Sequence, residues 1–159
     1  MIRQVLASLV LLASLGPTAA QDRCAEFAWP LHAEQALLSG APEGENGTTL
    51  PIGQGRRVTA SPLAQARLPA RPERGGPEVR AAFLQVGAAP SRVQVTLSDD
   101  AWVDIVQDGR FLRSLGSTGH RGCLGLRKSI RFETGGAPFV VQLSGPDLNS
   151  IAVVVTPAQ

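Results

Sequence analysis

Residues 92–97 read Arg-Val-Gln-Val-Thr-Leu, so apolar and polar side chains alternate along them. Successive side chains of a strand point to opposite faces, and this period of two predicts a half-buried strand. The same alternation recurs later in the chain, at 130–133, 139–143 and 151–155. Breaks rich in Gly, Pro, Asp and Asn separate these runs, and no helical pattern lies between them. The pattern predicts an all-β fold, an antiparallel β-sandwich of jelly-roll-like type.

One hairpin can be predicted with its register. Asp108-Gly109 is a preferred pair for a two-residue type I′ turn, and it sets Val106 opposite Phe111. Continued along both strands, this register sets Asp104 opposite Arg113 and Trp102 opposite Leu115. We therefore predict a structural ion pair between Asp104 and Arg113. Apolar side chains on both faces predict a central hairpin, with the N-terminal helix covering one face.

Residues 1–20 have the pattern of a secretory signal peptide. Arg3 precedes an apolar stretch, Val5 to Leu15, and Thr18-Ala19-Ala20 supplies the small residues of a cleavage site. The stretch is shorter than the ~20 residues that span a bilayer, so no membrane span is predicted. We expect residues 21–159 to form a single β-sandwich domain in the periplasm or the medium of a bacterium, which the Arg- and Ala-rich composition favours.

The chain has two cysteines, Cys24 and Cys123. In an oxidising compartment a pair with no competitor is most simply one disulfide. There is no Cys-x-x-Cys to favour redox or metal chemistry. The sequence predicts a structural Cys24–Cys123 bond.

The first part of the mature chain has two zones. Residues 24–39 contain one short predicted helix, with Pro30 at its start and Gly40 as its stop. Residues 40–79 are rich in Pro, Gly and Arg and are predicted to be irregular, with part of the segment pairing at a sheet edge. We expect Pro69 to Arg74 to be extended and to protect an edge.

Charge is unevenly distributed although the formal net charge is only +2. This balance indicates no nucleic-acid partner. Residues 99–108 hold four acids and no base, whereas 109–132 hold only bases. Five of the basic side chains could form one patch that binds an anionic ligand, glycan or protein: His120, Arg121, Arg127, Lys128 and Arg131. The alternative is a solvated strand face.

Signatures of catalysis are weak. A non-haem iron oxygenase needs two histidines and a carboxylate around the metal. The chain has only His32 and His120, in different zones, and no nucleophile elbow of the Gly-x-Ser-x-Gly type. Trp29 and Trp102 could be carbohydrate platforms, but their apolar neighbours favour packing in the core. We predict no cofactor and no catalytic residue.

Three motifs carry a resemblance that covers nearly all of the mature chain. They are the opening Cys24-x-x-Phe27-x-Trp29-Pro30, the turn Gln107-Asp108-Gly109-Arg110, and the run from Cys123 to Ser129. In these the chain resembles small exported alphaproteobacterial proteins of unknown function, some of which are labelled homogentisate 1,2-dioxygenase. Residues 93–156 also resemble, more distantly, β-sandwich domains of the pre-peptidase C-terminal type, which are accessory and binding modules of secreted hydrolases.

Together these observations predict a monomeric, non-catalytic binding or accessory module. The alternatives are a metal-dependent enzyme, which the dioxygenase label of similar proteins implies, and a structural envelope protein. Two histidines converging with a carboxylate would favour the enzyme. A sheet edge free to pair with another chain would favour the envelope protein.

Overall fold

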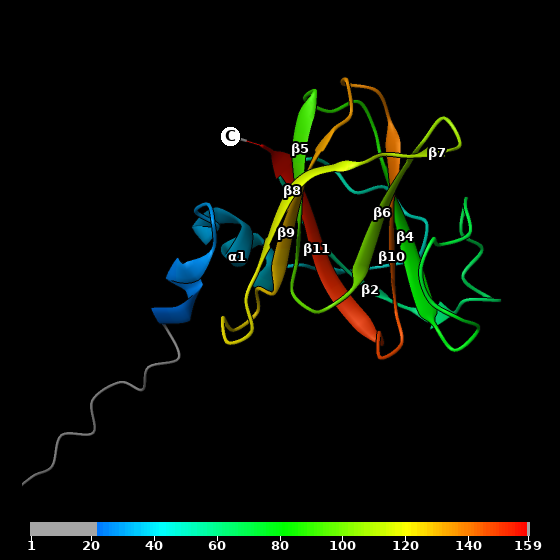
Figure 1. The fold of residues 1–159 in the computed structure, drawn as a ribbon, viewed down its shortest axis with the longest axis horizontal. Coiled ribbons are helices and arrows are strands. Elements are labelled where there is room, and N and C mark those ends of the chain that lie inside the picture. Colours follow the sequence, from blue (N-terminus) through cyan, green and yellow to red (C-terminus); the bar gives the residue numbers. More distant parts are fainter. Residues whose placement is uncertain (1–21, 159) are drawn as a thin grey trace, which may run out of the picture.

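The structure is a computed structural model that describes residues 22–158, and the predicted signal peptide lies outside the described residues. Two mainly antiparallel sheets face each other, as the alternation predicts (Figure 1). Sheet 1 has the order β1 (Glu43–Gly44), β2 (Gly55–Thr59), β11 (Ser150–Pro157), β5 (Arg92–Leu97), β9 (Lys128–Glu133), β8 (Ser114–Gly119). Sheet 2 has the order β3 (Ser61–Pro62), β4 (Arg80–Val86), β10 (Phe139–Gly145), β6 (Trp102–Gln107), β7 (Arg110–Phe111).

The core between the sheets is built from the apolar positions of the alternating runs. Val93, Val95 and Leu97 of β5 are buried there. The inward side chains of the other central strands join the same cluster: Ile130, Phe132, Phe139, Val141, Leu143, Ile151, Val153 and Val155. The predicted β-sandwich is therefore confirmed, and the period of two identified its core faces.

The predicted N-terminal helix is α1 (His32–Ser39), which follows a short 3-10 helix (Asp22–Glu26) and ends at Gly40. It packs on the outer face of sheet 1, against β11 and β2 (Figure 1). Glu34 is buried in this contact and accepts hydrogen bonds from Gln94 Nε2 at 2.7 Å and Thr156 Oγ1 at 2.8 Å. The helix therefore covers sheet 1 and not the 102–111 hairpin of sheet 2, so that part of the prediction is wrong.

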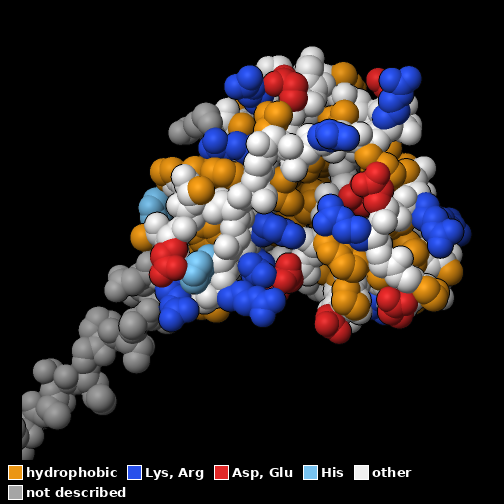
Figure 2. Space-filling view, viewed as in Figure 1, with side chains coloured by type: hydrophobic (Ala, Val, Ile, Leu, Met, Phe, Trp, Pro, Cys, Tyr) orange, Lys and Arg blue, Asp and Glu red, His pale blue; other side chains and the backbone are white. Residues whose placement is uncertain are grey.

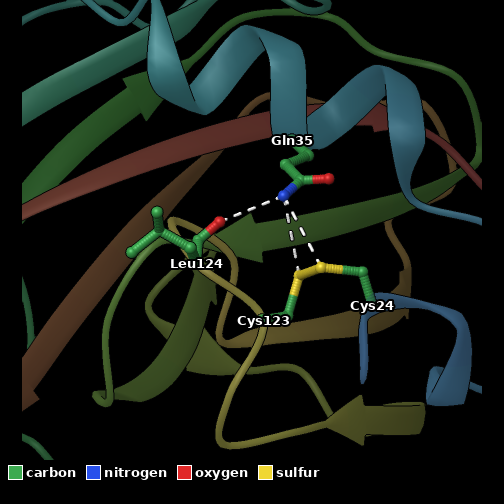
Figure 3. The surroundings of a disulfide bond; sticks show 4 residues. All are labelled: Cys24, Gln35, Cys123 and Leu124. Atoms are coloured by element: carbon green, nitrogen blue, oxygen red, sulfur yellow. Dashed lines mark hydrogen bonds between the residues drawn. A yellow bond between two sulfur atoms is a disulfide. The ribbon is translucent and has the colours of Figure 1, made fainter. Parts of the chain in front are cut away.

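The predicted disulfide is present between Cys24 and Cys123, with an S–S distance of 2.01 Å. Figure 3 shows Gln35 of α1 directed at it: Gln35 Nε2 lies 3.6 Å from Cys123 Sγ and donates to the Leu124 carbonyl at 3.0 Å. The bond thus ties together the start of the described chain, the helix and the loop before β9. A structural disulfide is the expected product of an oxidising compartment.

The Pro/Gly/Arg-rich segment 40–79 supplies β1, β2 and β3. Pro69–Arg74 does not protect an edge as predicted. Ala70 exchanges two hydrogen bonds, of 2.9 and 3.0 Å, with the side chain of Gln142 on β10, the middle strand of sheet 2. The segment therefore crosses the outer face of sheet 2 because a buried amide there binds its main chain.

The hairpin prediction is partly confirmed. Val106 pairs with Phe111 and Gln107 with Arg110, and both turn residues have positive φ, 50° at Asp108 and 72° at Gly109. After Leu112 the chain leaves sheet 2 and joins sheet 1 as β8. Among the described residues, no helix is long and apolar enough to cross a membrane.

Candidate functional site

A cleft lies at the side of the sandwich, where β6 and β7 of sheet 2 face β8 and β9 of sheet 1. Its volume is about 610 Å³. Figure 2 shows it as a recess with an apolar floor and with charged side chains around it. Five charged side chains line this cleft: Glu73, Arg74, Asp104, Arg113 and Lys128. The other lining residues are apolar or carry hydroxyl groups: Trp102, Val103, Phe111, Leu112, Ser114, Ser117, Ile130 and Phe132.

The cleft exists because the hairpin ends early. β7 pairs only with Val106 and Gln107, so residues 102–104 of β6 have no strand partner on that side. The chain that would have continued the hairpin instead crosses to sheet 1 (Figure 1). The two sheets are consequently not closed over each other along this side, and the floor of the cleft is the edge of the core, at Ile130 and Phe132.

Lys128 enters the cleft because of its place in β9. Ile130 and Phe132 point into the core, and Lys128 lies two residues earlier on the same face. Its ammonium group donates to the Ala101 carbonyl at 2.5 Å and lies 3.9 Å from a carboxylate oxygen of Asp100. Burial lowers the pKa of Lys128, and the Asp100 charge partly opposes this shift.

Asp104 is the buried carboxylate of the cleft, with 7% of its surface exposed. It lies next to Glu73 and Arg74, in the segment that crosses sheet 2. Burial raises the pKa of Asp104, the Arg74 charge lowers it, and the Glu73 charge raises it further. The strongest effect is the loss of water around the carboxylate, so burial disfavours the charged form of Asp104.

The predicted ion pair between Asp104 and Arg113 is wrong. No ion pair joins these two residues among the described residues. Arg113 lies in the connection between β7 and β8, beyond the point where the hairpin ends, and Ser114 already pairs with Phe132 of sheet 1. The two side chains still line the same cleft, Asp104 from β6 and Arg113 from the connection between β7 and β8.

The structure divides the predicted basic patch. Arg121, Arg127 and Lys128 gather around Asp100, with Arg127 Nη2 at 2.8 Å and Arg121 Nη2 at 3.9 Å from its Oδ2. His120 Nε2 instead lies 2.6 Å from Glu26 Oε2. His120, Arg121 and Arg127 lie in the loop between β8 and β9, and Lys128 begins β9. Each of the four has one nitrogen near a carboxylate oxygen.

Arg131 is on the other face of the sheet. Its guanidinium lies 4.0 Å from the ring centroid of Trp29, whose indole N–H donates to Ser129 at 3.4 Å. The alternation of β9 therefore separates Arg131 from Lys128 by the full thickness of the sheet. Trp29 is half-buried under this contact.

The two histidines do not form a site together. His32 is exposed at the start of α1, while His120 is held by Glu26 and packs edge-on against Phe27. In residues 22–158, no group of three or more His, Cys, Asp or Glu side chains is placed to hold a metal ion.

Sequence reasoning missed two members of the cleft. The sequence predicts that the segment of Arg74 protects an edge and that Trp102 packs in the core, but Arg74 lines the cleft and Trp102 is half-buried there. Comparison with family models, curated proteins and solved structures found no match for this chain.

Proposed function

We propose that the protein is an exported, non-catalytic binding module that holds an anionic ligand, such as an acidic glycan or protein segment, in the cleft between its sheets. The observation that carries the proposal is the convergence of three cationic side chains on one cleft: Arg74, Arg113 and Lys128. They come from three separate parts of the chain, so no local charge run explains their meeting.

Two of the three cations of the cleft are available to a ligand, while Lys128 already donates to the Ala101 carbonyl and lies near Asp100. Arg74 and Arg113 are both exposed, and neither takes part in an ion pair with any residue of the described chain. Arginine binds carboxylate, sulfate and phosphate through two parallel hydrogen bonds. Trp102 and Phe111 add aromatic surface beside them, and such surface binds the apolar part of a ligand.

The chemistry of the lining favours binding over turnover. The lining has hydroxyl groups at Ser114 and Ser117 but no histidine or cysteine. A serine nucleophile needs an adjacent base. Asp104 is the buried carboxylate of the lining, and burial raises its pKa. The disulfide and the predicted signal peptide support export to the periplasm or the medium.

The test is calorimetric titration of the mature protein with citrate, inorganic phosphate and a sulfated disaccharide, at about 0.05 and 0.5 M salt. We expect at least one anion to bind, more weakly at high salt. Arg74→Ala and Arg113→Ala should each weaken this binding by about tenfold or more, since a charge-assisted hydrogen bond contributes about 1.5–3 kcal/mol. Arg71→Ala is the matched control, because Arg71 is exposed in the same segment but lies outside the cleft. Equal binding by the Arg74 and Arg71 variants would refute the cleft as the site.

A further inference from the structure

The two sheets have four edge strands, and three of them are poor templates for pairing. β1, β3 and β7 are each two residues long, and they carry Glu43, Pro62 and Arg110. Short length, proline and charge are the usual means by which proteins prevent an edge from adding a further strand.

β8 has none of these protections. It spans six residues, Ser114–Gly119, and its side chains are uncharged and mostly small. It pairs with β9 on one side, and in the described chain no strand pairs with it on the other. Leu115, at the irregularity of the β8–β9 register, is 57% exposed. The contact that the N-terminal segment makes with β8 is to a side chain, Ala28 N–H donating to Thr118 Oγ1 at 2.9 Å, so no main-chain pairing occupies the outer side of β8 in the described chain.

The open edge lies beside the cleft. Ser114 and Ser117 of β8 line the cleft, opposite the unpaired residues 102–104 of β6. A strand added to β8 would extend sheet 1 along the mouth of the cleft. Because side chains alternate between faces, every second side chain of that strand would point toward the cleft.

The charges around β8 indicate which kind of strand could pair with it. Arg113 precedes the strand, and His120 and Arg121 follow it. A second copy of β8, paired antiparallel, would set Arg113 of each chain near the Arg121 end of the other, and like charges across a pair of strands destabilise it. Carboxylates in an added strand would instead meet Arg113 at one end and Arg74 and Lys128 in the cleft.

We infer that β8 binds an extended acidic segment of a partner protein as an additional strand of sheet 1, with alternate carboxylates directed to Arg74, Arg113 and Lys128. The inference rests on the proposed function, because it uses the same cleft. It adds that the ligand is a polypeptide and that its main chain contributes to binding.

The experiment measures fluorescence anisotropy of a labelled, blocked peptide that alternates glutamate and valine, with the full mature protein. We expect binding that falls at least tenfold when alternate amides of the peptide are N-methylated, because methylation removes strand pairing and keeps every charge. Replacing the glutamates with lysines should abolish binding. Leu115→Glu should weaken binding by about tenfold, while Leu124→Glu should not, since Leu124 is 90% exposed but outside β8.

The outcomes separate this inference from the proposed function. Suppose that small anions bind through Arg74 and Arg113 but that the peptide does not bind, or binds equally when N-methylated. That result would overturn the added strand and leave the cleft as an anion site. A dimer in sedimentation that Leu115→Glu dissociates would show that β8 pairs with a second copy, and would also overturn it. Failure of both small anions and peptides would refute the two proposals together.

Discussion

At the scale of single residues, Asp104 shows how the cleft differs from the rest of the surface. Its carboxyl group is buried between β6 and the segment that carries Glu73 and Arg74, and burial raises its pKa. When a folded-state pKa lies above the unfolded one, the protonated form contributes stability below the ordinary aspartate range. That contribution is lost as the pH rises through the raised pKa.

We therefore expect Asp104→Asn, which is neutral at every pH, to have a higher Tm than the wild-type protein at neutral pH. The difference should shrink as the pH falls to about 4, near the ordinary pKa of aspartate. Thermal unfolding followed by circular dichroism between about pH 4 and 7 measures this. Asp147→Asn, at an exposed position, is the control. A variant that is less stable at neutral pH would mean that attraction to Arg74 outweighs the effect of burial.

At the scale of elements, the contact between α1 and sheet 1 combines the packing of Leu38 against Ala152 and Val154 with one buried carboxylate. Glu34 Oε1 accepts from both Gln94 and Thr156, which lie on neighbouring strands β5 and β11. Because each donor is buried, removing the acceptor leaves two unsatisfied polar groups, and each of these costs about 1–3 kcal/mol.

We expect Glu34→Ala to lower the free energy of unfolding by about 2–4 kcal/mol in urea denaturation. Glu34→Gln is the matched control, since it keeps the carbonyl oxygen and should lose less than half as much. Equal losses in both variants would show that the charge, and not the acceptor oxygen, holds the helix on the sheet.

The strands and the hairpin turn also show which parts of the fold can be predicted from the sequence. The inward positions of β5, β9, β10 and β11 follow from alternation, since each strand has one face in the core. The turn at Asp108-Gly109 set the register of the two pairs nearest to it. Local sequence did not reveal that the chain leaves sheet 2 after Leu112, because residues on both sides of that point suit a strand. Whether they stay in the hairpin depends on β9, which offers a partner in the other sheet.

The difference between local patterns and tertiary contacts also explains which residues of the cleft can be predicted from the sequence. Lys128 was identified from its charge, and its place on an inward face follows from period two. Arg131 is close to Lys128 in sequence, which predicts one patch, but alternation puts the two on opposite faces of the sheet. Arg74 reaches the cleft only because Gln142 binds Ala70 and guides the segment across sheet 2, a tertiary contact with no local pattern.

At the scale of the whole molecule, both strand pairing and the disulfide join parts of the chain that are far apart in sequence. β11, the last strand, lies between β2 and β5 in the middle of sheet 1. Cys24 and Cys123 are 99 residues apart in sequence. Such non-local pairing makes folding dependent on closing long loops, and a disulfide across most of the chain reduces the entropy of the unfolded state.

We therefore expect the double variant Cys24→Ser, Cys123→Ser to lose about 2–5 kcal/mol of unfolding free energy. Serine preserves a polar partner for Gln35, so the variant isolates the covalent bond. Because the unfolded chain becomes less compact, the urea m-value should rise as the midpoint falls. The wild-type protein unfolded in excess reductant should give the same midpoint and m-value as the variant. An unchanged midpoint under oxidising conditions would mean that packing of α1 alone holds the N-terminal segment, and that the bond adds nothing to stability.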